Sequence, residues 1–427
     1  MKSSILWYIL VITVLITSCN KEEKLASTLP IIKLTADEAD LFSDSIGIYV
    51  KGIGTASNWQ GEKANYFDKR RIKANFSFEQ NGTEHLNQDI IMRVSGGGSR
   101  KQAQKSFNLY ADKSVGPSYF HYPFFSDLQD SFFNTLRLRN SGQDWNRSHM
   151  RDALMHTIVQ DLDVYGQAYE PVVVYLNSRY WGIYNLREKF NKNYIRRHQN
   201  LSKEVKFDIL ERHHDVDEGS ADDYVALVDY LLQHDLSDQK HFNHVISQID
   251  TANFLDYYCA QIYFANTDWP GNNIKYWKAR LPDAKWNWFL HDTDLGFALA
   301  PLFMHPGGVD HNTLAFNLND QDTNLHNQPW ATLLFRKLTE NQVFKEVFVK
   351  HFLKLLDDEF SAERVIPIID ELQSRLRPEI PRHIERWKGE DPSFYQSVSD
   401  WETEVELLRD FAHQRADIVK GHLEQWD

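Results

Sequence analysis

The periodicity of the apolar residues changes along the chain, and this change constrains the fold more than any other feature of the sequence. Between Ile32 and about Tyr110, apolar and polar residues alternate in runs bounded by glycine and asparagine, a pattern typical of β-strands. From about Gln328 to the C-terminus, apolar residues recur at helical spacing instead. The sequence therefore predicts an α+β protein with a β-rich N-terminal part and a mostly helical C-terminal part.

Shorter patterns place individual elements. Asn81-Gly82 and Asn177-Ser178 are predicted to form the turns of two hairpins. Strands are predicted over 47–54, 71–82 and 88–98, then a helix over 150–162, a hairpin of 172–176 and 180–186, helices over 224–235 and 252–266, and a strand pair over 273–279 and 285–290. This order of elements is the layout of a two-lobed, kinase-like fold, although other α+β folds share it.

The N-terminus has the features of a targeting segment. One lysine is followed by an apolar stretch from Ile5 to Ile16 and by small residues directly before Cys19. This arrangement resembles a bacterial lipobox, which implies removal of residues 1–18 and a diacylglycerol on the Cys19 sulfur. We therefore expect residues 19–29 to tether an extracytoplasmic protein to a bacterial membrane, with the outer membrane favoured. An uncleaved anchor is the alternative, but the apolar run is short for a membrane span.

Charge and cysteine content exclude several classes of protein. The formal net charge is -13, which argues against nucleic acid as a partner because phosphate neutralisation needs a basic surface. A local basic segment from Arg93 to Lys105 is the exception. With Cys19 assigned to the lipid, Cys259 stands alone in an apolar run, so a buried, unreactive thiol is expected. The sequence indicates no oligomeric state.

The first candidate catalytic segment is NTDWPGNNIKYW, in which Asn273 follows Asp268 and a predicted strand comes next. Protein kinases use this spacing in their catalytic loop, where the Asp orients the attacking hydroxyl and the Asn holds a metal ion. The His-Arg that normally precedes the Asp is replaced by Asn266-Thr267. An ordinary turn next to Pro270-Gly271 would use the same residue types.

The second candidate is the acidic pair Asp292 and Asp294, which follows the predicted strand 285–290. In kinases, the metal-binding Asp-Phe-Gly comes after the catalytic loop, and Asp294-Leu295-Gly296 has the same outline. Two carboxylates this close in the chain can present oxygen atoms to one Mg²⁺ or Mn²⁺. We expect Asp292 to be the main ligand and Asp294 the second, with the reverse order and a purely structural strand end as alternatives.

The third candidate is a glycine-rich turn in the segment RVSGGGSRKQAQK. Gly96, Gly97 and Gly98 let the backbone approach a ligand closely, and Ser99 and Arg100 add hydrogen-bond donors. A turn of this kind followed by a strand lysine can bind phosphates. It is not a P-loop, because no Gly-Lys-Ser/Thr opens a helix. A flexible hairpin with solvated charges is the alternative.

These segments, together with NSGQDWNRSHMRDAL and VVVYLNSRYWGIYNLREK, resemble the successive blocks of the CotH kinase family. They occur in the family's order from about residue 90 to about residue 300. The resemblance implies an atypical protein-kinase-like fold, with a β-rich part over 30–115, a catalytic core over 116–340 and a helical region over 341–427. It also implies ATP and Mg²⁺ or Mn²⁺ as cofactors.

The resemblance assigns roles to individual residues. Asp268 and Lys105 would be catalytic, with Lys105 touching the nucleotide phosphates beside the turn Gly96–Arg100. Asn273, Asp292 and Asp294 would hold the metal, because they occupy the corresponding positions in the family's sequence blocks.

Two further assignments have local alternatives. Glu188, after the predicted hairpin, would contact the nucleotide or pair with Arg187 or Lys189. Asp152 would pair with Lys105, as a helix Glu does in ordinary kinases, or it would form a local pair with its neighbour in the chain.

The expected function is that of an extracytoplasmic kinase that transfers phosphate from ATP to Ser or Thr of secreted or surface proteins. A non-catalytic surface lipoprotein that binds a protein or a glycan is the main alternative. Its aromatic side chains would stack on sugars, although a core position is favoured for each of Trp145, Trp181, Trp269 and Trp330. A metal-dependent hydrolase that uses Asp292 and Asp294 is the third possibility.

Overall fold

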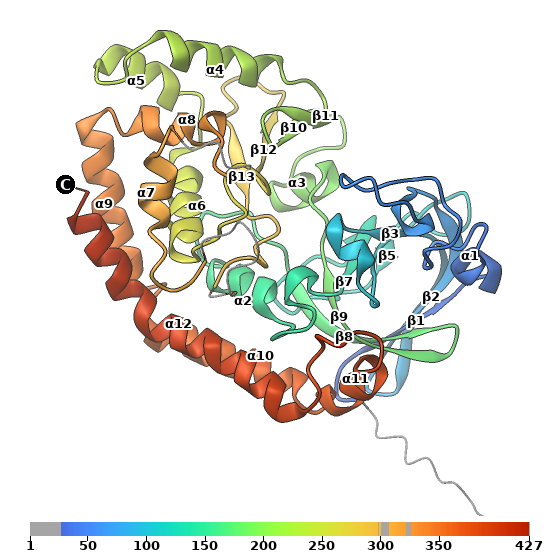
Figure 1. Ribbon diagram of the computed structural model, residues 1–427. Coiled ribbons are helices and arrows are strands. Elements are labelled where there is room, and N and C mark those ends of the chain that lie inside the picture. The colour runs from blue at the N-terminus through green and yellow to red at the C-terminus, as the bar shows by residue number, and fades with distance from the viewer. Residues whose placement is uncertain (1–26, 298, 300–306, 322–325, 427) are drawn as a thin grey trace, which may run out of the picture.

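The computed structural model of the protein describes residues 27–297, 299, 307–321 and 326–426. The predicted signal peptide and the predicted lipid attachment site, Cys19, lie outside these residues. The β-sheets lie mainly in the N-terminal half and the helices mainly in the C-terminal half, as predicted (Figure 1). Within the part of the chain that is described, no helix has both the length and the apolar character needed to cross a membrane.

Seven strands of the N-terminal half close into a barrel in the order β1-β2-β3-β4-β7-β9-β8. All neighbouring strands are antiparallel except β1 and β8, whose parallel pairing closes the ring. The strands are β1 (Ile31–Thr35), β2 (Ile72–Gln80), β3 (Thr83–Ser95), β4 (Ser106–Tyr110), β7 (Thr135–Arg139), β8 (Tyr169–Leu176) and β9 (Arg179–Arg187).

The alternation of residue types decides which side of each strand faces the barrel core. Met92, Leu109 and Leu136 pair directly across β3, β4 and β7, and all three are fully buried. The intervening residues of the same strands point outward, because successive side chains of a strand alternate between its two faces, and apart from Ile91 they are polar or charged. The outer face of this part of the barrel is therefore polar, which matters for the candidate site.

Both predicted hairpin turns are confirmed. Asn81 and Gly82 connect β2 to β3, and Asn177 and Ser178 connect β8 to β9. All four residues have positive φ, the backbone conformation that two-residue hairpin turns of this type require.

Two predictions of secondary structure are wrong. Residues 47–54 form turns rather than a strand. Their glycines lie against other backbone, and a Cβ on Gly52 would come within 2.3 Å of the Asp44 carbonyl oxygen. The predicted helix over 150–162 ends earlier, as α2 (Arg151–Ile158). Asp161 and Asp163 would place negative charge at the negative end of the helix dipole, which disfavours its continuation.

The predicted strand pair over 273–279 and 285–290 is also confirmed. It forms part of a separate sheet with the order β11-β10-β12-β13, in which all neighbours are antiparallel. These strands are β10 (Phe207–Glu211), β11 (Asp215–Glu218), β12 (Lys275–Ala279) and β13 (Asn287–Phe289). A small pair of strands, β5 (Phe120–His121) and β6 (Phe132–Phe133), lies between β4 and β7 in the chain.

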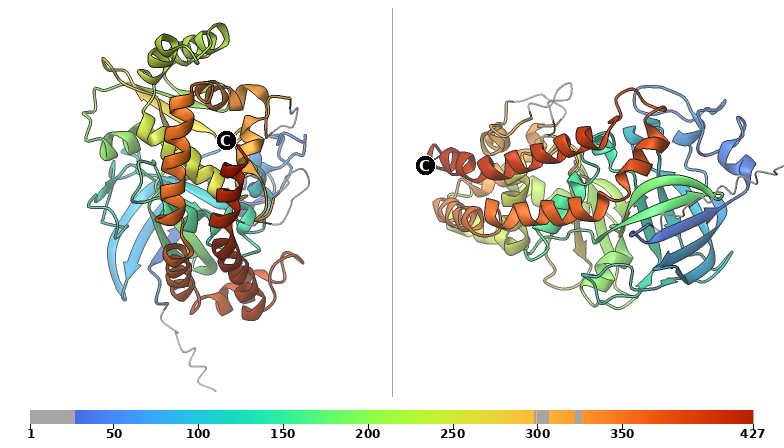
Figure 2. Two further views of the ribbon diagram at one scale, coloured as in Figure 1. Left: turned by 90° about the vertical axis from the view of Figure 1, so that its left-hand side faces the viewer. Right: turned by 90° about the horizontal axis from the view of Figure 1, so that it is seen from below.

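The C-terminal half is built around α6 (Thr251–Tyr263), in which every residue from Asn253 onward is buried. The long helices α10 and α12 run side by side, as the right-hand view of Figure 2 shows. The remaining helices are α1 (Glu38–Phe42), α3 (Lys192–His198), α4 (Asp222–Gln233), α5 (Gln239–Ile246), α7 (Thr313–Leu318), α8 (Pro329–Leu338), α9 (Gln342–Asp357), α10 (Ala362–Leu376), α11 (Ile380–Trp387) and α12 (Val398–Glu424), with 3₁₀ turns η1 (Asn65–Phe67), η2 (Gly98–Lys101) and η3 (Gly142–Asp144).

Helix α11 attaches this half to the barrel. The backbone N–H of Ile183 on β9 donates to His383 Nδ1 (3.0 Å), and Trp387 Nε1 donates to the carbonyl oxygen of Trp181 (3.2 Å). Gly182 allows this approach, because a Cβ there would come within 2.5 Å of His383 Nδ1.

Candidate active site

Asp268 lies in the loop that connects α6 to β12, and a buried tryptophan fixes this loop. Trp269 is fully buried and packs edge-on against Tyr258, with ring centroids 5.0 Å apart. The Asp268 carboxylate accepts hydrogen bonds from the side chains of Asn272 (3.1 Å) and Asn273 (2.7 Å) and lies 2.7 Å from His326 Nδ1. The carboxylate of Asp268 is mostly buried, and these contacts fix its orientation.

Asn273 connects the two acidic segments. Its side-chain amide nitrogen donates to Asp268 and also to the backbone carbonyl oxygen of Asp292 (3.1 Å). Asn273 and Asp292 both have positive φ, a conformation that asparagine and aspartate adopt more readily than most residues. The loop that contains Asp268 and the strand end that contains Asp292 therefore meet in space.

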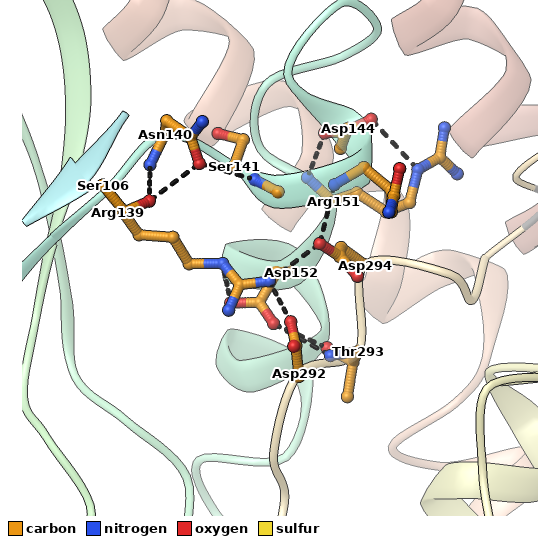
Figure 3. A network of polar contacts seen from close by, with 12 residues as sticks. Ser106, Arg139, Asn140, Ser141, Asp144, Arg151, Asp152, Asp292, Thr293 and Asp294 are labelled. Carbon is orange, nitrogen blue, oxygen red and sulfur yellow. Dashed lines mark hydrogen bonds and ion pairs between the residues drawn. The ribbon is translucent and has the colours of Figure 1, made fainter. Parts of the chain in front are cut away.

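Arg139, at the end of β7, is the cation around which the carboxylates gather (Figure 3). Its guanidinium donates to the carboxylate of Asp292 and to Asp294 Oδ2 (2.8 Å). It also lies 3.8 Å from Asp152 Oδ2 on α2. One buried arginine thus ties the barrel to α2 and to the segment after β13.

The carboxyl groups of this cluster differ in the direction of their pKa shifts. Burial and the neighbouring Asp292 raise the pKa of Asp294 well above its usual value. Burial acts in the same direction on Asp152, but Arg139 and Arg187 outweigh it and hold the pKa of Asp152 well below the usual value. Burial also opposes ionisation of Asp292, whose pKa is nevertheless lowered by Arg139 and His291.

The loop between β7 and α2 holds Asp294 in place. The backbone N–H of Gln143 donates to Asp294 Oδ2 (2.8 Å). A Cβ on Gly142 would lie 1.8 Å from the same oxygen, so only glycine fits there. Asp144 and Arg151 form a buried ion pair (3.1 Å), and Arg151 also donates to the carbonyl oxygen of Phe297, which fixes the loop against the segment after Asp294 (Figure 3).

The arginine of the glycine-rich turn stabilises the turn itself. Arg100 donates to the backbone carbonyl oxygens of Gly96 (2.6 Å), Tyr66 (3.2 Å) and Phe67 (3.1 Å), so its side chain closes the turn. Gly97 and Gly98 face open space. Ser99 lies close to Gly96, where a Cβ would meet its hydroxyl. The turn is connected to the acidic cluster through Gln102, which donates to the carbonyl oxygen of Gly142 (2.6 Å).

Lys105 does not pair with Asp152, and this prediction is wrong. The Lys105 ammonium donates to the backbone carbonyl oxygens of Arg100 (2.8 Å) and Gln102 (2.9 Å) and lies over the ring of Tyr66. Burial lowers the pKa of Lys105 to about 7. Asp152 is instead neutralised by Arg139 and Arg187, because β7 and β9 carry these arginines directly to α2.

Glu188 is fully buried and pairs with neither of its chain neighbours. Its carboxylate contacts Arg197 (2.6 Å) and His198 (3.0 Å) on α3 and accepts from the backbone N–H of Ala168 (3.1 Å). Burial opposes ionisation, but His198 and Arg197 lower the pKa of Glu188 below its usual value. These contacts satisfy the carboxylate within the protein.

A row of basic residues lies on the outer face of the barrel, and the sequence motifs did not predict it. Arg93, Asn108 and Arg137 pair directly across β3, β4 and β7, so their side chains share this face. Lys189 follows β9, and burial and the charges of Arg137 and Arg93 lower its pKa to about 8. The negative charge of Asp292 is close enough to favour the charged form of Arg137. The row therefore lies beside the acidic cluster.

None of the three cations in this row forms an ion pair within the described ranges. The alternation of leucine and arginine in TLRLR, residues 135–139, could have indicated this basic row. Because Leu136 and Leu138 occupy the barrel core, Arg137 and Arg139 must point the other way.

The oxygen donors near Asp292 fit a divalent cation of the Mg²⁺ type. The Asp292 side chain is 35% exposed, and Asn273 uses only its amide nitrogen in the contacts above, which leaves its side-chain oxygen for a ligand. Among the described residues, no group of three or more His, Cys, Asp or Glu side chains could hold a metal ion. Mg²⁺ binds through one or two protein oxygens together with phosphate and water. Asp294 is buried and already accepts from Arg139 and from the Gln143 backbone, so it is the poorer ligand.

The aromatic residues considered for sugar binding are mostly core residues. Trp145, Trp181 and Trp269 are buried, and only Trp330 is partly exposed. Cys259 is buried as predicted, and burial raises the pKa of its thiol well above the usual value.

The mixed α/β architecture and the meeting of acidic and basic side chains beside β13 are consistent with a kinase-like protein. The family model of the CotH kinase protein matches residues 92–419, which is most of the chain. The protein therefore belongs to the CotH kinase family, as its sequence motifs predicted. No curated protein matches the chain.

Proposed function

We propose that the protein is an atypical kinase that transfers the γ-phosphate of ATP to Ser or Thr of secreted or surface proteins, with Mg²⁺ or Mn²⁺. The observation that carries this proposal is the bridge formed by Asn273 between Asp268 and Asp292. It supports a site in which a hydroxyl-orienting carboxylate lies next to the oxygens that hold a metal–nucleotide complex. In this proposal the barrel half and the helical half are the two lobes of a kinase-like fold.

The residues divide the chemistry between them. Asp268 orients the acceptor hydroxyl and receives its proton as the oxygen bonds to the γ-phosphorus and ADP leaves. Arg93, Arg137 and Lys189 contact phosphate oxygens, which their unpaired charges suit. Asp292 and Asn273 would hold a divalent metal ion, which would neutralise phosphate charge. Gly96–Arg100 and Glu188 shape the surrounding backbone in this proposal, and Lys105 supports the turn rather than touching the nucleotide.

The test combines nucleotide binding with phosphate transfer. The purified protein is titrated with ATP in the presence of Mg²⁺ or Mn²⁺, and phosphate on the protein or on an acceptor is measured by mass spectrometry. Replacing Arg137 and Lys189 by glutamine is expected to weaken ATP affinity by about tenfold or more, since two charge-assisted contacts are lost. Lys285→Gln, at an exposed position, is the matched control. A folded protein with no saturable affinity for ATP and metal would sink the proposal.

A non-catalytic binding protein is the second candidate, and one observation favours it. Lys105 is engaged with backbone carbonyls, while Arg139 contacts both carboxylates of the acidic pair. A pseudokinase-like protein would bind its protein or glycan ligand equally well when Asp268 is replaced by asparagine. It would also show no phosphate transfer.

We also propose a lipid anchor on Cys19 that holds the protein on the outside of a bacterial membrane. The support is the sequence pattern before Cys19. In cells, Cys19→Ser is expected to abolish incorporation of labelled fatty acid and to move the protein out of the membrane fraction. An unchanged membrane fraction together with an unchanged label would contradict the anchor.

A further inference from the structure

A cavity of about 460 Å³ lies at the C-terminal end of α2 and plays no part in the proposed phosphate transfer. It is bounded by His156 of α2, by Gln160 just after this helix, by the segment that leads to β8, by α3 and by the start of α6. The candidate active site uses the other end of α2, where Asp152 lies. Cavities of this size are typical of sites for small ligands or for a single side chain of a partner.

The lining of the cavity carries an excess of negative charge. Asp127, Asp163 and Asp250 contribute carboxylates, and none of them forms an ion pair within the part of the chain that the structure describes. No lysine or arginine lines the cavity. Glu188 also lines it, but Arg197 and His198 neutralise this carboxylate.

His156, one of the two histidines in the lining, adds no positive charge. Burial, followed by the charge of Arg187, lowers the pKa of His156 to about 4, so its ring is neutral at neutral pH. His156 Nδ1 accepts from the backbone N–H of Gln167 (2.9 Å), which fixes the ring in the wall.

Three tyrosine residues also line the cavity. Tyr169 lines it, and the buried hydroxyl of this residue has no hydrogen-bond partner in the described structure. Tyr165 and Tyr194 also line it. An unpartnered buried hydroxyl is costly unless a ligand or water satisfies it. Tyrosine rings beside carboxylates favour a cationic group, which gains from both.

We propose that this cavity binds an organic cation, either an alkylammonium or a guanidinium group. A free polyamine and a Lys or Arg side chain of a partner protein both supply this chemistry. A neutral sugar would also find acceptors here, but it would leave the three carboxylates without a counter-charge. The proposal does not depend on phosphate transfer, because Asp127, Asp163 and Asp250 have no role in the candidate active site.

Calorimetric titration of the full folded protein at low salt tests the proposal. The probes are spermidine, a short tri-lysine peptide and a neutral trisaccharide. Replacing Asp127 and Asp163 together by asparagine is expected to weaken binding of the cationic probes by about tenfold, because two attractive charges are removed. The control pair Asp229→Asn and Asp283→Asn makes the same change in net charge at exposed positions elsewhere, and it is expected to leave the affinity unchanged.

A second variant blocks the space and keeps the charge. Ala252 is exposed on the first turn of α6 and lines the cavity, so Ala252→Trp is expected to fold and to abolish binding. Binding of spermidine alone identifies a free amine as the ligand, and preference for the peptide identifies a basic protein segment. Binding of only the trisaccharide would overturn the proposal. So would the absence of saturable binding, or a loss that is equal in the control pair.

Discussion

Asn273 donates a 2.7 Å hydrogen bond to the carboxylate of Asp268, and the same amide group reaches the backbone of the strand end at Asp292. This contact joins two segments that are separated by a strand pair in the chain. The position of the proposed catalytic carboxylate is therefore set relative to the proposed metal ligand by a single side chain.

Replacement of Asp268 by asparagine is expected to abolish most phosphate transfer and to leave the fold intact. The amide keeps the shape of the carboxylate but cannot receive the hydroxyl proton, and loss of such a group typically costs about 10²- to 10⁴-fold in rate. Transfer is measured by mass spectrometry, and ATP affinity and the melting temperature are compared with those of Asp229→Asn. Full activity in Asp268→Asn would remove this residue from the mechanism.

Arg139→Met is expected to destabilise the protein strongly, because the buried carboxyl groups of Asp152 and Asp294 and the partly exposed Asp292 would lose their shared cation. Breaking a buried ion pair in this way typically costs about 3 to 5 kcal/mol. Urea unfolding measures the change in the free energy of unfolding. Arg377→Met removes a surface ion pair with Glu402 and is the control, with an expected cost below about 1 kcal/mol. A similar small loss in both variants would show that the cluster is not held by Arg139.

Gly142→Ala is expected to displace Asp294 and the loop before α2. The new Cβ would collide with the Asp294 carboxyl group, and the φ of +60° at this position disfavours alanine as well. A cost of about 1 to 3 kcal/mol is expected from the strained backbone, with a further contribution from the collision. Thermal unfolding measures it, with Gly389→Ala as the control because open space surrounds that glycine. Equal stability of the two variants would argue against the close approach.

The lowered pKa of Lys105 is expected to make the stability of the protein depend on pH. Burial lowers its pKa to about 7 in the folded state, below its value in the unfolded chain. The unfolded state therefore binds more protons between about pH 7 and pH 10, so the folded state is penalised at low pH and gains stability as the pH rises through this window.

The comparison of wild type with Lys105→Met isolates this effect. Relative to the variant, the wild type is expected to gain about 2 kcal/mol between pH 7 and pH 9. The measurement is a series of urea unfolding curves at fixed ionic strength. A difference that stays constant with pH would show that Lys105 titrates normally, and an improvement at lower pH would contradict the sign of the effect.

The meeting of Asp268, Asn273 and Asp292 could be predicted from the sequence because their spacing is local. Asp268 and Asn273 lie in one short loop, and the segment with Asp292 follows the next strand pair. Geometry within such a unit depends little on the rest of the chain. The interpretation of the glycine-rich turn as a ligand site had the same local basis, but Arg100 and Lys105 turn out to contact backbone carbonyls of their own neighbourhood.

The partners of Asp152 could not be predicted in this way. Arg139 and Arg187 reach it from different strands of the barrel, and Lys105 is placed elsewhere by the register of β4 with its neighbours. A kinase-like analogy places a lysine beside this carboxylate. The strand order of the closed barrel places two arginines there instead.

The sequence by itself determined the segregation of strands and helices, both hairpin turns, the strand pair before Asp292 and the family to which the chain belongs. These features depend on residue patterns over a few positions, such as alternation in strands and positive φ at Asn-Gly. Only the tertiary structure decided which charges meet. Barrel closure and strand register bring Arg139 to Asp292 and Asp294, and they align Arg93 with Arg137 on one face, because a contact between distant segments depends on packing rather than on spacing in the chain.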